Sequence, residues 1–247
     1  MDARSGVLQH LSTPGADSRF AYLPAAVRSA TGRREHEVWE AVWGLVADGL
    51  LYLDPEGPGT GPDNWRCKLS AAGIRVISGG PWEPGDPEGY LRRLRRQVPT
   101  LDPLAERYVE EALRAFNARC YLATSVMLGV ASEQVFNLLA AAFVGSGLAG
   151  DKLARLIDDP AKTYFARFQE LRKRLEPIRD DLPENLGDVL TLDAVGDLLR
   201  VTRNAAGHPS EQRLDEETAR THLQMAVLYL TKMTALAEHF SVDEQPP

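Results

Sequence analysis

The residues of this chain best suited to chemistry lie together near position 205. Arg203 and Asn204 are followed closely by His208. Arginine is a permanent cation whose planar donors fit phosphate oxygens, and histidine titrates near neutrality. Such a pair can hold a phosphodiester and transfer a proton beside it. The spacing therefore predicts a site for phosphate chemistry.

A helix end must bring these residues together. Apolar spacing predicts a helix over about 190–206, Gly207 suits the left-handed position that ends a helix, and Pro209 cannot continue it. On an uninterrupted helix, side chains five residues apart point about 140° away from each other. If the helix unwinds at Gly207, His208 can turn back toward Arg203.

The pattern Arg-polar-x-x-x-His at the end of a helix, within an all-helical region, resembles the signature of the HEPN superfamily (higher eukaryotes and prokaryotes nucleotide-binding). An apolar helix carrying Ser132-Glu133 precedes it, a spacer rich in Lys and Arg follows that helix, and a last amphipathic helix follows the motif. The resemblance covers residues 102–241 and is closest to a bacterial branch with Arg-Asn-x-x-x-His. It implies a metal-independent endoribonuclease of the toxin–antitoxin, CRISPR or phage-defence kind, with RNA as substrate and no cofactor.

For RNA cleavage, the chain must help a 2′-hydroxyl attack phosphorus, stabilise the phosphorane and protonate the leaving 5′-oxygen. The candidates are His208 as acid or base, Arg203 as the phosphate clamp and Asn204 to orient either, with Glu133 as the acidic residue on the preceding helix. The products would be a 2′,3′-cyclic phosphate and a 5′-hydroxyl. One histidine cannot easily be both acid and base, so the resemblance also implies a homodimer.

A structural interpretation of the same residues stays open. Arg203 can pair with Glu133 across two helices, and His208 can cap the helix carboxyl end, where a cation is favoured. Asn137 shares the face of Glu133 and can complete such a network. The matching function is a non-catalytic adaptor or transcriptional regulator whose helical bundle serves dimerisation.

Residues 1–80 are expected to form a winged helix-turn-helix domain. Helices are predicted near 4–11, 23–30 and 33–48, followed by a hairpin of 50–53 and 65–69 around a Gly/Pro-rich wing. Such a domain can bind DNA, RNA or a protein partner. The candidate nucleic-acid contacts are Arg33, Arg34, Arg66 and Lys68 in this domain, and Arg200 in the second.

Two features of the predicted recognition helix oppose DNA binding. Glu35, Glu37 and Glu40 follow the paired arginines and would repel a phosphate backbone on any shared face. Trp39 and Trp43 are four residues apart and share a face, which favours core packing or a partner-binding patch.

Residues 81–101 are expected to form a linker with a basic segment at 91–96, residues 102–241 the helical HEPN-like domain, and residues 242–247 an acidic tail. Helices are predicted over 102–116, 119–144, 151–157, 164–175, 190–206 and 215–239. The predicted fold class is thus mainly α, with a winged helix followed by an all-α bundle.

The net charge is −7, and residues 102–247 carry 16 Lys+Arg against 23 Asp+Glu. An RNA site must therefore be a local basic pocket in an acidic surround. Cys67 and Cys120 form no metal-ligand pattern, so metal binding is not expected. No signal peptide is evident, and the apolar stretch 120–144 contains polar residues, so a cytoplasmic protein without a membrane span is expected.

Overall fold

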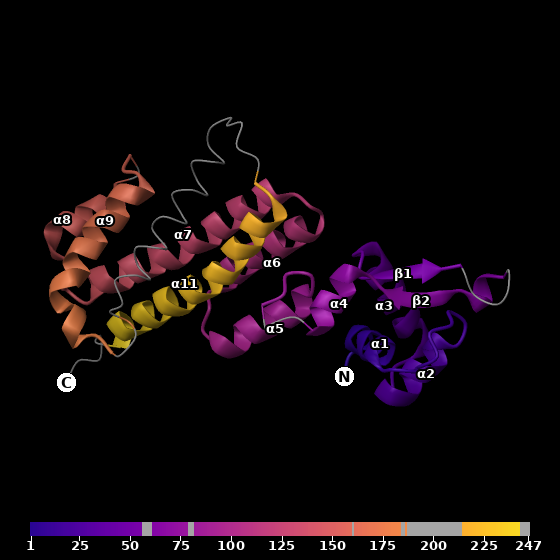
Figure 1. The fold of residues 1–247 in the computed structure, drawn as a ribbon. Helices are drawn as coiled ribbons and strands as arrows, with labels where there is room; N and C mark the ends of the chain where they lie inside the picture. The colour runs from indigo at the N-terminus through magenta and orange to yellow at the C-terminus, as the bar shows by residue number, and fades with distance from the viewer. Residues whose placement is uncertain (56–60, 79–81, 160, 184–185, 187–213, 243–247) are drawn as a thin grey trace. The chain divides into compact units, whose positions relative to one another are not determined.

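The computed structural model describes residues 1–55, 61–78, 82–159, 161–183, 186 and 214–242 (Figure 1). It divides into two compact units, Met1–Asp86 and Pro87–Pro247. In the described residues the chain is mainly helical, with one two-stranded antiparallel sheet. The mainly α fold class predicted from the sequence is confirmed.

The first unit alternates helices with a small hairpin. Its elements are α1 (Ala3–Ser12), α2 (Leu23–Thr31), α3 (Glu35–Ala47), β1 (Leu51–Asp54), the short 3-10 helix η1 (Pro62–Asn64), β2 (Arg66–Leu69) and α4 (Ala71–Ser78). In the hairpin, Leu51 lies opposite Leu69 and Asp54 opposite Arg66. A backbone bridge from Arg19 to Arg66 adds the segment before α2 to the edge of β2.

The core of this unit follows the apolar spacing of α3. Val38, Val42 and Leu45 are fully buried at intervals of four and three residues, as one face of a helix requires. Gly73 of α4 lies so close to β1 that an added Cβ would be 2.2 Å from the carbonyl oxygen of Leu50. Glycine at this position lets α4 approach the backbone that begins the hairpin.

The second unit is built from helices. They are α5 (Pro87–Gln97), α6 (Pro103–Asn117), α7 (Tyr121–Gly145), α8 (Gly150–Asp158), α9 (Tyr164–Leu175), the 3-10 helix η2 (Glu176–Asp181) and α11 (Glu216–Val242). The helix predicted over 164–175 has those bounds, and the neighbouring helices lie within a few residues of expectation. The helix predicted over 190–206 lies outside the described residues, as do positions 243–247 of the expected acidic tail.

Helix α5 occupies the stretch that was expected to be a linker, and it packs within the second unit. The buried Tyr90 hydroxyl donates to the carbonyl oxygen of Leu223 in α11, at 2.7 Å. Leu91 and Leu94 are buried beside it, while Arg95 pairs with Glu106 of α6 at 2.6 Å. The basic residues therefore lie on the polar side of an amphipathic helix whose apolar side is packed.

Helices α7 and α11 run parallel, side by side in Figure 1. Three contacts set their register, Ser125 with His222, Ser132 with Tyr229, and Phe143 with Phe240, and each pair is 97 residues apart. A constant separation means that both helices advance in the same direction. Parallel neighbours need a long return connection, and α8, α9 and η2 lie within it.

Helix α7 lies between α6 and α11, to which it makes its main contacts. By length and composition it is long and apolar enough to cross a membrane, and among the described residues it is the one such helix. Its buried positions include Thr124, Ser125 and Ser132, whose polar groups are hydrogen-bonded inside the bundle. This is the pattern of a central helix in a packed bundle.

Candidate functional site

The predicted motif falls in the connection that links the parallel helices. Arg200, Arg203, Asn204 and His208 lie outside the described residues. By chain position they follow α9 and η2 and precede α11. The described part of the candidate site is therefore Glu133 and the side chains around it.

Glu133 lies half-buried near the middle of α7, beside a chain of hydroxyl groups. The Tyr229 hydroxyl of α11 donates to the carbonyl oxygen of Ser132 at 3.2 Å and lies 3.1 Å from the Tyr164 hydroxyl of α9. A phenol has one proton, so Tyr164 must be the donor to Tyr229. The chain thus runs from α9 through α11 to the backbone of α7.

Tyr229 is held neutral by its surroundings. Burial raises the pKa of its hydroxyl, and the negative charge of nearby Glu133 raises it further. A neutral Tyr229 keeps its hydroxyl proton and donates it in the hydrogen bond to the Ser132 carbonyl oxygen. Glu133 is therefore set beside a fixed hydrogen-bond chain, which joins the three helices that surround it.

A second buried polar pair lies further toward the start of the same two helices. Ser125 Oγ is 2.8 Å from His222 Nδ1, with Ser125 fully buried and His222 nearly so. Burial lowers the pKa of His222, so the ring is neutral at physiological pH. These are residue types of a nucleophile and a base, but no substrate reaches a fully buried serine. The pair is a packing feature between α7 and α11.

Arg33 and Arg34 lie at the turn between α2 and α3. Arg33 helps to line a hollow of about 340 Å³, whose other lining residues are Ala25, Arg28, Ser29 and Gly32. Each arginine has a carboxylate neighbour: Arg28 lies 3.5 Å from Glu35, and Glu37 lies 4.0 Å from Arg33 and 3.4 Å from Arg34. These carboxylates reduce the positive potential of the hollow.

Arg66 and Lys68 are exposed and, two residues apart on β2, share one face of the hairpin. Lys68 pairs with Asp54 of β1, which raises the pKa of its ammonium group. Arg66 adds to the positive field at Asp17. The structure therefore brings the wing cations together with acidic neighbours, as it does at the helix turn.

The tryptophans of α3 combine both roles considered for them. Trp39 is half-buried and lies 4.6 Å from the ring of Phe20, whereas Trp43 is 51% exposed and lies 5.7 Å from that ring. The exposed side chains of α3 thus include Glu35, Glu40 and Trp43 but no Lys or Arg. That combination suits a protein surface better than a phosphate backbone.

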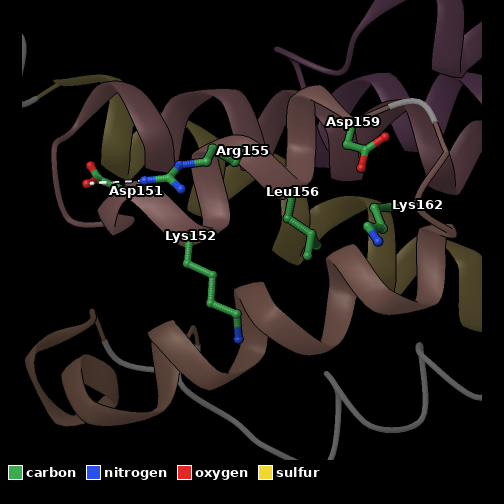
Figure 2. A pocket seen from close by; sticks show the side chains of 6 residues that line it. All are labelled: Asp151, Lys152, Arg155, Leu156, Asp159 and Lys162. Carbon is green, nitrogen blue, oxygen red and sulfur yellow. Dashed lines mark ion pairs between the residues drawn. The ribbon is translucent and has the colours of Figure 1, made fainter.

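A further hollow, which was not singled out from the sequence, lies at α8 and the turn before α9 (Figure 2). It measures about 340 Å³ and is lined by Asp151, Lys152, Arg155, Leu156, Asp159 and Lys162. Five of the six lining residues are charged, and Lys162 begins a run to position 174 that holds five basic residues against one acidic residue.

Neither cysteine supports a metal or redox site in the described residues. Cys67 is buried, which raises the pKa of its thiol to about 11, and Cys120 is exposed. Within the described ranges, no group of three His, Cys, Asp or Glu side chains could hold a metal ion.

Comparison with protein-family models, with curated proteins and with solved structures finds no match.

Proposed function

We propose that the chain is a metal-independent endoribonuclease of the HEPN type that acts as a toxin or phage-defence effector. The observation that carries the proposal is the parallel packing of α7 and α11. In chain order the Arg203–His208 sequence follows α9 and η2 and precedes α11, which contacts α7 beside Glu133. The proposal assigns Glu133 and the motif to one site.

In this proposal each residue has a distinct role. Arg203 holds the phosphate through two parallel hydrogen bonds, and His208 exchanges the proton of the 2′-hydroxyl or of the leaving oxygen. Asn204 orients the phosphate, and Glu133 orients the arginine. A second copy of the chain supplies the second histidine, so the active form is a homodimer that leaves 2′,3′-cyclic phosphate and 5′-hydroxyl ends.

We also propose that the first unit is a winged helix. The supporting observation is its element order: α1, an edge segment bridged to β2 at Arg19, then α2, α3 and a hairpin. Arg33 and Arg34 begin the third helix, and Arg66 and Lys68 lie on the hairpin, where such domains contact a partner.

The test uses purified protein, end-labelled single-stranded RNA and EDTA. Wild type, Arg203→Ala and His208→Ala are compared, with His36→Ala as the control because His36 is an exposed histidine on α3. We expect wild type and His36→Ala to cleave and the motif variants to lose activity by about a hundredfold or more. Fragment ends are then identified by phosphatase treatment. A 2′,3′-cyclic phosphate resists the phosphatase, and a 5′-hydroxyl can be labelled without it.

Cleavage that survives in both motif variants would contradict this site, and intact RNA with folded wild-type dimers would contradict the activity. Glu133→Gln gives a further measurement, since it keeps the size of the side chain while removing its charge. If Glu133 orients Arg203, this variant cleaves more slowly than wild type and unfolds at a similar temperature.

One observation favours a second function, that of an adaptor or regulator. Cations of the first unit are paired with Glu35, Glu37 and Asp54, while Tyr22, Trp43 and Tyr52 are about half exposed. Aromatic side chains with balanced charge suit a protein partner. If the chain is an adaptor or regulator, wild type does not cut RNA. The Trp43→Ala variant then fails to bind the protein partner that wild type binds.

A further inference from the structure

We propose that the exposed face of α9 binds single-stranded RNA. This face is defined by Phe165, Gln169, Arg172 and Lys173, together with Lys162 in the turn before the helix. The proposal extends the ribonuclease function to a substrate surface separate from the motif, and it is tested by binding without cleavage.

Helical spacing brings these side chains to one side of α9. Positions 165, 169, 172 and 173 follow the four-and-three repeat of one face, whereas Phe168, Leu171 and Leu175 are buried on the other. From Phe165 to Lys173 the face extends about 12 Å along the helix axis. Such a length suits several units of an extended chain.

Phe165 is the stacking element of this face. Its side chain is 50% exposed, although Phe168, one turn along, is buried against Phe136 of α7. Burial of apolar surface is favourable, and half of this ring remains in contact with water in the isolated chain. A base that stacks on the ring removes part of this surface from water.

Two cations of this face, Lys162 and Lys173, are exposed to phosphate groups. Within the described part of the chain, neither Lys162 nor Lys173 forms an ion pair. Glu170, the one acidic residue of α9, is buried on another side and is occupied by Lys152 at 2.8 Å and Arg174 at 3.3 Å. No carboxylate of α9 therefore opposes a phosphate on the exposed face.

The hollow at α8 adjoins this surface at Lys162. Figure 2 shows Lys152 and Leu156 pointing from α8 toward α9, with Lys162 at the turn between them. Arg155 lies 3.8 Å from Asp151, and both side chains are more than four-fifths exposed, so their pairing is weak. Asp151 and Asp159 also line the hollow, so the surface proposed for phosphate contacts ends at Lys162.

Single-stranded RNA fits this arrangement better than the other polyanions. Double-stranded RNA hides the faces of its bases, so Phe165 would have no stacking partner. An acidic peptide would pair with Lys162 and Lys173 but would leave the exposed ring without a planar group. In single-stranded RNA, phosphates can contact Lys162 and Lys173 while an unpaired base stacks on Phe165.

The experiment measures the binding of a short fluorescein-labelled oligoadenylate by anisotropy, over a range of salt concentrations. All proteins carry His208→Ala in the full chain, so that RNA stays intact. The variants are Phe165→Ala and the pair Lys162→Ala with Lys173→Ala. The matched control is Leu104→Ala with Arg107→Ala, which removes an exposed apolar side chain and an exposed cation from α6.

Phe165→Ala is expected to raise Kd about fivefold or more with an unchanged salt slope, because stacking is not ionic. Removing both lysines is expected to lower the slope of log K against log salt by about 1.4, the value for two phosphate contacts on a single strand. The control keeps the Kd and the slope of the His208→Ala parent. Circular dichroism and thermal unfolding establish that each variant is folded.

The proposal is overturned if the α9 variants bind like the control, or if the parent does not bind the oligoadenylate. It is also overturned if duplex RNA or polyglutamate competes as well as unlabelled single strands. Cleavage by wild type decides the ribonuclease separately. RNA binding through α9 without cleavage would leave this proposal standing and reject the ribonuclease, whereas cleavage with unchanged binding in the α9 variants would do the reverse.

Discussion

Ser125 Oγ of α7 lies 2.8 Å from Nδ1 of His222 in α11, in the interior of the second unit. Seven residues further along both helices, the Tyr229 hydroxyl donates a hydrogen bond to the backbone carbonyl of Ser132. Between two otherwise apolar helices, a shift by one turn would leave these buried polar groups without partners. The polar pairs therefore set the register of α7 against α11.

The first prediction concerns the pH dependence of stability. Burial lowers the pKa of His222 below its ordinary value of 6.5, so the unfolded chain takes up a proton at a higher pH than the folded chain. The contribution of the neutral ring is complete above 6.5 and is lost as the pH falls toward the folded pKa. Urea unfolding between about pH 7.5 and about pH 5.5 should show this decline.

His222→Gln keeps a hydrogen-bonding group near Ser125 but does not titrate. We expect its unfolding free energy to fall less over that pH range than that of wild type. His36→Gln on α3 serves as the control and should follow wild type. An identical decline in His222→Gln and wild type would show that other groups are responsible.

The second prediction concerns the hydroxyl chain beside Glu133. Tyr229→Phe removes the bond to the Ser132 carbonyl and the acceptor of the Tyr164 hydroxyl, so it should lower the free energy of unfolding by about 1 to 2 kcal/mol. Tyr164→Phe should cost less, since Tyr164 is only half-buried and the bond from Tyr229 to the Ser132 carbonyl stays. The double variant should be less destabilised than the sum of the two, and strict additivity would mean that the hydroxyls do not interact.

The third prediction concerns the contact between α4 and β1. Gly73→Ala would place a Cβ 2.2 Å from the Leu50 carbonyl oxygen, and backbone atoms cannot move away as a flexible side chain can. We expect a loss of about 2 kcal/mol or more from the first unit, measured by thermal unfolding.

Gly44→Ala is the matched control for this clash. Gly44 lies in α3, and an added Cβ would have one neighbour, a guanidinium nitrogen of Arg4, at 4.0 Å. Alanine is favoured over glycine in a helix, so this variant should be neutral or more stable by up to about 1 kcal/mol. Equal losses from both substitutions would contradict the close approach at Gly73.

The fourth prediction concerns the tight turn between α6 and α7. Arg119 has a φ of 60° and is the one described residue other than glycine with a positive φ. Side chains carry a cost of about 1 kcal/mol in this conformation, and glycine does not. Arg119→Gly should therefore raise the unfolding temperature, whereas Arg119→Ala should not. A stabilisation by alanine as large as that by glycine would assign the effect to the lost charge.

Local features of the fold were predictable from the sequence because they depend on neighbouring residues. Asp102 was expected to begin a helix, and its carboxylate accepts from the amides of Leu104 and Ala105. The helix predicted over 33–48 ends at Ala47, and Gly49, two residues further on, has a φ of 69°. Caps and left-handed ends are properties of a few adjacent residues, and the sequence contains them in full.

For the candidate site, the sequence determined which residues can do chemistry, as their types and spacing do not depend on the fold. It also predicted the half-buried acid Glu133 on an apolar helix. It did not predict that Glu133 lies beside Tyr229, nor that Ser125 meets His222. Those partners are 96 and 97 residues apart in the chain. The spacing of apolar residues predicts which face of a helix is buried, but it does not predict which other helix packs against that face.

The tertiary structure decided the matters that depend on packing between distant segments. It placed α5 in the second unit through Tyr90, set α7 parallel to α11, and buried Glu170 between Lys152 and Arg174 while leaving Phe165 exposed. Each outcome depends on which apolar faces exclude water together, a choice made by the whole chain. The sequence by itself determined most of the described helices and the types of the reactive side chains, and packing determined which side chains meet.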